Sequence, residues 1–163
     1  MSVAPTAPSR SAPEPARRSE RHERALALLE RLEAGAAERV SASLGEVSDD
    51  LSEIVLGFAF ADVVSRPAID LRTREMLTVA ALTALGTAPG QLEFHVRAAR
   101  NVGVTREEIV EIVLQMAVYA GVPACVNGIA AAKRAFAAAG ANGRGDRRES
   151  GPSSSEDSFS TDP

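Results

Sequence analysis

Apolar residues recur at helical spacing through the middle of the chain, and no stretch alternates apolar and polar residues as a half-buried strand would. Glycine, proline and capping residues separate the apolar stretches from one another. Helices are expected near residues 19–34, 36–44, 51–65, 71–86, 91–103, 106–121 and 123–140. The pattern therefore predicts an all-α domain of six or seven helices.

Several helix ends can be assigned from residue type. Asp70 precedes an apolar helix and is a suitable N-cap, and Thr105 with Glu108 three residues later forms a capping-box pattern. Between Met76 and Leu85 the helix is apolar on nearly all sides. A helix of this kind is expected to lie buried between other helices.

Both ends of the chain differ in composition from its middle. Residues 1–18 are rich in Pro, Ala and Ser, and residues 141–163 are polar with little to bury. Such segments are expected to be disordered tails. The predicted helical domain therefore covers residues 19–140.

Composition excludes several function classes. The net charge of −4 argues against a broad positive surface for nucleic acid, and no apolar run reaches the ~18 residues of a membrane span. The N-terminus lacks the apolar segment of a secretory signal, so a cytoplasmic protein is expected. The single cysteine, Cys125, excludes a disulfide or dithiol pair within one chain and a zinc site built on CxxC. No metal site is predicted.

One helical stretch, QLEFHVRAARNVG from Gln91, carries a histidine among apolar residues. At helical spacing Leu92, His95 and Ala99 share one face. His95 can be a core residue with one ring nitrogen bonded to a backbone carbonyl, or a proton shuttle in a pocket, a task to which imidazole is well suited near neutral pH. The other histidine, His22, lies in a charged helix and is expected to be exposed.

Few other polar residues interrupt the apolar helices. Glu75 is expected in the first turn of one helix, beside Arg74, where it would interact favourably with the helix dipole. Gln115 and Tyr119 share a helix face, where they can bond to each other or to a ligand's oxygen. Cys125 lies near a helix start, where a lowered thiol pKa is one alternative and a buried, inert thiol the other.

Taken together, three motifs resemble the carboxymuconolactone decarboxylase family. They are the arginine-rich RTRE entering an apolar helix, QLEFHVRAA around His95, and GVTREEI followed by QMAVYAGVP. The resemblance covers about residues 20–138. It implies an all-helical fold, a ring-like homo-oligomer such as a hexamer or trimer, and a cofactor-free decarboxylase acting on a 4-carboxymuconolactone-type substrate in aromatic degradation.

The resemblance also implies site residues. In related alkylhydroperoxidase-D-like reductases a CxxC pair precedes the histidine that matches His95, but the matching TAPGQLEFH here has no cysteine, which argues against thiol peroxidase chemistry. A glutamate in those relatives partners the histidine, and Glu75 is close to its position. His95 would donate the proton, with Glu75 as its orienting partner. Arg74 or the more weakly placed Arg97 would bind a substrate carboxylate.

Further substrate-binding candidates are Gln115 and Tyr119, as donors to a lactone oxygen, and Cys125 in the pocket wall. Phe58 and Phe60 stand where many decarboxylases look Trp-rich, so the substrate can differ from carboxymuconolactone. Two alternatives therefore stay open. One is an acid–base tailoring enzyme on a larger molecule of secondary metabolism, and the other is a non-catalytic helical scaffold or ligand-binding homologue.

Overall fold

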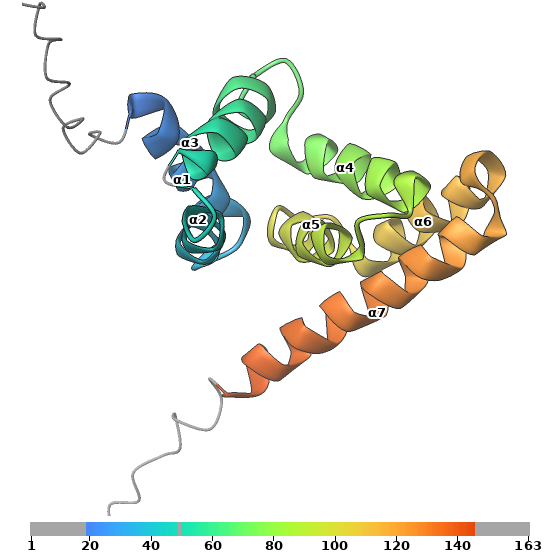
Figure 1. Ribbon diagram of the computed structural model, residues 1–163. Coiled ribbons are helices and arrows are strands. Elements are labelled where there is room, and N and C mark those ends of the chain that lie inside the picture. The colour runs from blue at the N-terminus through green and yellow to red at the C-terminus, as the bar shows by residue number, and fades with distance from the viewer. Residues whose placement is uncertain (1–18, 49, 146–163) are drawn as a thin grey trace, which may run out of the picture. The chain divides into compact units, whose positions relative to one another are not determined.

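The computed structural model describes residues 19–48 and 50–145, and every regular element within these ranges is a helix (Figure 1). The predicted all-α fold is confirmed. Contacts between the helices divide the chain after Ala68 into two compact units. The two predicted tails lie largely outside the described residues.

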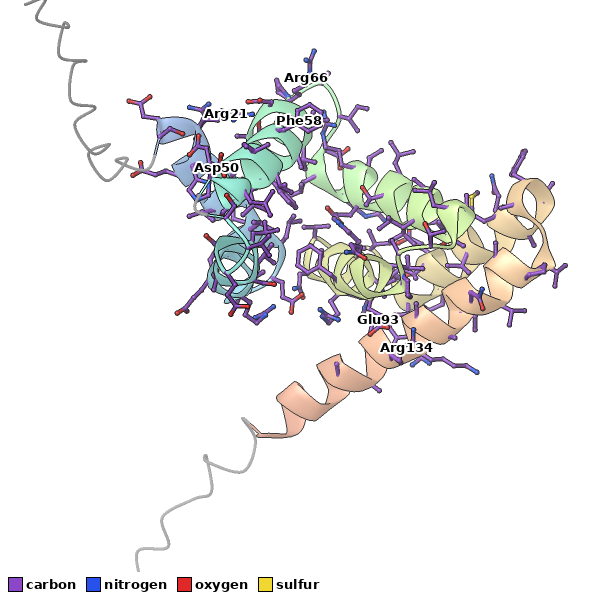
Figure 2. The ribbon with its side chains drawn as sticks, viewed as in Figure 1. Arg21, Asp50, Phe58, Arg66, Glu93 and Arg134 are labelled. Atoms are coloured by element: carbon purple, nitrogen blue, oxygen red, sulfur yellow. The ribbon has the colours of Figure 1, made fainter. Side chains whose placement is uncertain are left out.

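The N-terminal unit contains α1 (Glu20–Leu32), α2 (Ala36–Gly45), α3 (Leu51–Leu56) and η1 (Gly57–Val64). Ser19 is the N-cap of α1, and its hydroxyl accepts a hydrogen bond from the backbone N–H of His22 at 3.2 Å. Leu29 and Leu32 are buried, as the helical spacing predicts. The ion pair between Arg21 and Asp62, with 2.6 Å between Nη2 and Oδ2, joins α1 to η1 (Arg21 is labelled in Figure 2).

The helix predicted over 51–65 is continuous but changes its hydrogen bonding at Gly57. From there to Val64 it is a π-helix, and at its end the Ser65 N–H donates to the Phe60 carbonyl five residues earlier at 3.0 Å. Apolar periodicity in so short a segment does not separate this winding from an α-helix, so the sequence could not predict it.

The C-terminal unit contains α4 (Leu71–Leu85), α5 (Pro89–Asn101), α6 (Arg106–Ala120) and α7 (Val122–Gly145). The predicted caps are confirmed, since the Asp70 carboxylate accepts from the Thr73 N–H at 2.9 Å and Thr105 with Glu108 forms a capping box. The last helix continues past its expected end at Gly140, and Figure 1 shows α7 extending beyond the other helices of its unit.

One apolar core holds these four helices together. It includes Val79 of α4, Val96 of α5, Val113 of α6 and Ala132 of α7, all with almost no exposed surface. Gly128 permits the close approach of α7, because a Cβ there would lie 2.8 Å from Thr83 Cγ2 and 2.9 Å from Val113 Cγ1. At the surface, Arg134 of α7 pairs with Glu93 of α5 (Figure 2).

The prediction that α4 is buried on nearly all sides is wrong. Glu75, Val79 and Thr83 form its buried stripe, whereas Leu77 and Leu85 are exposed. Three packed neighbours cover only part of a helix circumference, so apolar residues remain outside the core. Within the part of the chain that the structure describes, no helix is long and apolar enough to cross a membrane.

Candidate active site

The partly buried His95 and the buried Glu75 form a dyad between two helices of the C-terminal unit. His95 Nδ1 lies 2.7 Å from Glu75 Oε2, a hydrogen-bond distance. The Glu75 side chain is 1 % exposed and that of His95 is 15 % exposed. The carboxylate is therefore shielded from water, while part of the imidazole stays accessible.

The packing of α4 on α5 positions the dyad. Asp70 fixes the start of α4, which places Glu75 in the second turn rather than in the first turn as expected, on the same stripe as Val79. On α5, Leu92 and Val96 are buried beside His95 and hold the helix against the core. The two side chains thus approach from neighbouring helices whose rotation is set by apolar burial.

The geometry specifies which ring nitrogen is free for chemistry. An imidazole whose Nδ1 bonds to a carboxylate keeps Nε2 as the atom that can give or take a proton. The Phe94 ring meets the His95 ring edge-on, with 4.9 Å between centroids and 80° between planes. The dyad is therefore an imidazole oriented by a carboxylate bonded to its Nδ1, an arrangement suited to general acid–base catalysis.

The two arginines proposed from sequence flank the dyad along the chain. Arg74 immediately precedes Glu75, and its Nε donates to the Ile69 carbonyl at 3.1 Å. Arg97 lies two residues after His95 on α5 and is half-buried. Both helices that carry the dyad thus also carry a cation close to it in sequence.

The remaining predicted site residues lie elsewhere in the unit. Gln115 and Tyr119 line an open groove of about 800 Å³ between α4 and α6, together with Met76, Leu77, Ala80, Glu107, Glu108, Glu111, Ile112, Met116 and Val118. Neither His95 nor Glu75 lines this groove. Cys125 is buried in the apolar core of the unit. The structure therefore brings His95 and Glu75 together, places Gln115 and Tyr119 on this groove and places Cys125 in the core.

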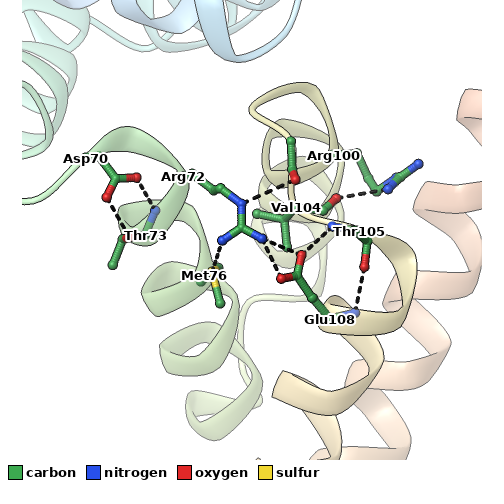
Figure 3. A network of polar contacts seen from close by, with 9 residues as sticks. Asp70, Arg72, Thr73, Met76, Arg100, Val104, Thr105 and Glu108 are labelled. Atoms are coloured by element: carbon green, nitrogen blue, oxygen red, sulfur yellow. Dashed lines mark hydrogen bonds and ion pairs between the residues drawn. The ribbon is translucent and has the colours of Figure 1, made fainter.

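A polar network that no local sequence pattern predicted lies at the starts of α4 and α6 (Figure 3). Arg72 Nη2 lies 2.6 Å from Glu108 Oε2, and its Nε donates to the Gly103 carbonyl at 3.3 Å. Glu108 also accepts from the Thr105 N–H at 2.7 Å. This backbone bond, followed by the Arg72 guanidinium, lowers the pKa of Glu108. The capping box identified Glu108, but nothing in the local sequence revealed its partner.

The prediction that His22 is exposed is wrong. Its side chain is only 6 % exposed, and Nδ1 has no hydrogen-bond partner in the described part of the chain. Glu53 Oε2 lies 4.0 Å away, beyond hydrogen-bond distance. The charged residues around His22 in sequence fall on the solvent side of α1, while His22 shares the inner side with Ala25 and Leu29.

The described residues contain no group of three His, Cys, Asp or Glu side chains placed to hold a metal ion.

Comparisons with known proteins show what the chain is similar to. The model of the carboxymuconolactone decarboxylase family matches residues 49–134, a stretch that contains both members of the dyad. A 4-carboxymuconolactone decarboxylase of Acinetobacter baylyi is 39 % identical over 82 residues, which cover 50 % of this chain and 60 % of that relative.

Two further relatives match at similar levels. A nitrosuccinic acid decarboxylase of Metarhizium robertsii is 40 % identical over 79 residues, covering 45 % of this chain and 51 % of the relative. An uncharacterized 15.0 kDa protein of Paracoccus denitrificans is 35 % identical over 79 residues, covering 48 % of this chain and 59 % of that relative. The chain thus spans between half and three fifths of the length of these curated relatives.

Proposed function

The chain belongs to the carboxymuconolactone decarboxylase family, and we propose that it is a decarboxylase of a small acid that works by acid–base catalysis at His95. The observation that carries the proposal is the 2.7 Å contact between His95 Nδ1 and the buried Glu75 carboxylate. Two relatives named as decarboxylases support the reaction type.

The chemistry of the two named substrates is compatible with one catalytic group. In 4-carboxymuconolactone the electron pair left by CO2 flows into an unsaturated lactone, and in nitrosuccinic acid it flows into the nitro group beside the leaving carboxylate. The substrate itself is the electron acceptor, so this step needs no cofactor. What the protein must supply is a proton for the resulting carbanion.

His95 is proposed to supply that proton from Nε2. Glu75 holds the ring by Nδ1 and stabilises the charged imidazolium before the transfer. Because Glu75 is shielded from water, its interaction with the imidazole is weakly screened. The full reaction is then loss of CO2, movement of the electron pair into the acceptor, and proton transfer from Nε2 to carbon.

Arg74 is proposed to bind the substrate carboxylate, with Arg97 as the weaker candidate. A guanidinium matches a carboxylate in bidentate geometry. The proposal predicts that Arg74→Ala raises KM or lowers kcat, and an effect below twofold on both would leave Arg74 a structural role only. Gln115 and Tyr119 line a groove that neither His95 nor Glu75 lines, so they are weaker candidates for substrate contacts than Arg74. Cys125 is the weakest candidate, because it lies in the apolar core.

The function is tested by CO2 release from 4-carboxymuconolactone and from nitrosuccinic acid. Wild type and His22→Gln should turn over one of them, and His95→Gln should be slower by about 100- to 10,000-fold, the usual worth of positioned proton transfer. His22→Gln is the matched control, since it replaces the other buried histidine. Turnover of neither acid would favour a larger substrate of secondary metabolism or a non-catalytic homologue.

We also propose that the chain forms a homo-oligomer. Its C-terminal unit exposes apolar side chains on three helices: Leu77 and Leu85 of α4, Leu114 and Val118 of α6, and Val122 and Val126 of α7. A surface of this kind is typical of a protein interface. Light scattering should give a mass above that of one chain and a lower mass for Val118→Asp, and a monomeric wild type would contradict this.

A further inference from the structure

We infer that the His95–Glu75 dyad has a second activity, the exchange of hydrogen with solvent on carbon acids that carry no leaving carboxylate. The carbon acids in question have a C–H bond next to a nitro or carbonyl group. The inference rests on the proposed function only in assuming that the dyad faces the bound molecule.

The contacts of the dyad define a device for moving protons in either direction. His95 Nδ1 is bonded to Glu75 Oε2 at 2.7 Å, so Nε2 is the ring nitrogen that remains to exchange a proton with a bound molecule. Glu75 interacts equally well with an imidazole that has just received a proton and with one about to release it. Nothing in this arrangement depends on the departure of CO2.

The burial of the two side chains determines how the proton is replaced. Glu75 is almost fully enclosed, whereas the His95 side chain keeps an exposed fraction of 15 %. Solvent therefore reaches the dyad through the imidazole, which can take up or lose a hydron between turnovers. A site whose only proton were sealed from water would not exchange.

The exchange step is balanced without any other reactant. Neutral Nε2 removes the proton from carbon, and the C–H electron pair moves into the nitro or carbonyl group as the N–H bond forms. The imidazolium exchanges this proton for a solvent deuteron. Return of the deuteron to carbon restores the acceptor and leaves one C–D bond in place of C–H.

Microscopic reversibility links this activity to the proposed reaction. A group that protonates the carbanion after CO2 loss must also remove that proton from the product. The product of the proposed reaction therefore belongs to the class that should exchange. A suitable probe is 3-nitropropanoate, which combines an acidic C–H beside a nitro group with a carboxylate for an arginine.

The test is proton NMR of 3-nitropropanoate in deuterated buffer with the full chain. Wild type and His22→Gln should remove the signal of the CH2 next to the nitro group about 100-fold faster than His95→Gln does. Glu75→Gln should also slow the exchange, since it removes the carboxylate that stabilises the imidazolium. Circular dichroism establishes whether each variant is folded. If His95→Gln does not fold, Glu75→Gln still tests the dyad.

Two outcomes would overturn the inference. One is exchange by wild type no faster than in buffer, and the other is equal exchange by wild type and both dyad variants. The CO2 assay on the same preparation separates this from the proposed function. CO2 release without exchange leaves the loss of CO2 standing and removes the second activity, together with proton transfer from His95 as the final step, whereas absence of both removes both.

Discussion

The two histidines of this chain lie in different units, and each faces a glutamate on a neighbouring helix. In the C-terminal unit His95 Nδ1 is bonded to Glu75 at 2.7 Å, whereas in the N-terminal unit His22 Nδ1 lies 4.0 Å from Glu53 and has no hydrogen bond. His22 is the more deeply buried of the two side chains. Burial of a histidine therefore does not by itself make a dyad.

The difference lies in the two carboxylates. Glu75 is 1 % exposed, and a carboxylate without water needs a hydrogen-bond donor close by. The Glu53 side chain is 35 % exposed, and its Oε1 accepts from the hydroxyl of the helix-capping Ser19. Glu53 is thus satisfied by solvent and Ser19. The C-terminal pair is a candidate active site because the Glu75 carboxylate is shielded from water and bonds to His95.

The largest expected effect comes from exchanging the two acids for amides. Glu75→Gln should lower kcat by about 100-fold, because the imidazolium loses its buried counter-charge. Glu53→Gln should leave kcat within about twofold, since its carboxylate bonds to a cap and to water. Steady-state kinetics on the accepted substrate measures both, and KM should change little in either. Equal losses of kcat would abolish the distinction between the two regions.

The next largest effect concerns packing. Gly128→Ala should destabilise the C-terminal unit by about 1–3 kcal/mol, because the new Cβ meets the short, buried side chains of Thr83 and Val113. Gly57→Ala in the N-terminal unit is the matched control. The atoms nearest to its Cβ would belong to the Arg21 guanidinium, the far end of a flexible side chain.

Denaturant unfolding monitored by circular dichroism measures both glycine variants. The free energy of unfolding should change by less than about 1 kcal/mol for Gly57→Ala. A larger loss for Gly57→Ala than for Gly128→Ala would show that the approach of α7 to α4 and α6 is not the tighter contact.

A smaller effect is expected from the helix caps. Thr105→Ala and Ser19→Ala each remove a side-chain oxygen that accepts from a backbone N–H, and each should cost about 1 kcal/mol of unfolding free energy. The two variants differ in a second respect. Ser19→Ala also releases Glu53, which becomes free to approach His22. The NMR resonances of the His22 ring should therefore shift in Ser19→Ala and stay unchanged in Thr105→Ala. An unchanged His22 signal in Ser19→Ala would contradict the restraining role of Ser19.

The smallest effect is the response to acid. Hydrogen bonds from the Thr73 and Thr105 backbones lower the pKa values of Asp70 and Glu108, and the Arg21 side chain lowers the pKa of Asp62. A carboxylate with a lowered folded-state pKa stabilises the fold above its ordinary value and loses that contribution as the pH falls through the lowered one.

The contribution of these three carboxylates to stability should therefore be constant above the ordinary Glu pKa of 4.5 and should decrease below it. Thermal unfolding across this range measures the change. Glu108→Gln should show a weaker dependence than wild type, because one of the three groups no longer titrates. An identical dependence in the variant would mean that Glu108 contributes nothing to it.

Local patterns predicted much of the fold. Apolar spacing gave the helices, and short-range chemistry gave the caps at Asp70 and Thr105 because both partners of each bond lie within three residues. The π-helical winding after Gly57 and the exposure of Leu77 were not predictable in this way. Both depend on which helices pack against a given helix, and those helices are formed by residues far away in the sequence.

For the candidate site, the sequence by itself determined the reactive residue types and their helix faces: His95 lies on an apolar face, and Glu75 lies near the start of an apolar helix. The family resemblance implied that these two residues meet. Only the tertiary structure decided that His95 has a buried acid at bonding distance, that His22 does not, and that Arg72 bonds to Glu108. The physical reason is that a hydrogen bond between helices requires two rotations and one separation to be correct together, and the packing of the whole core sets all three.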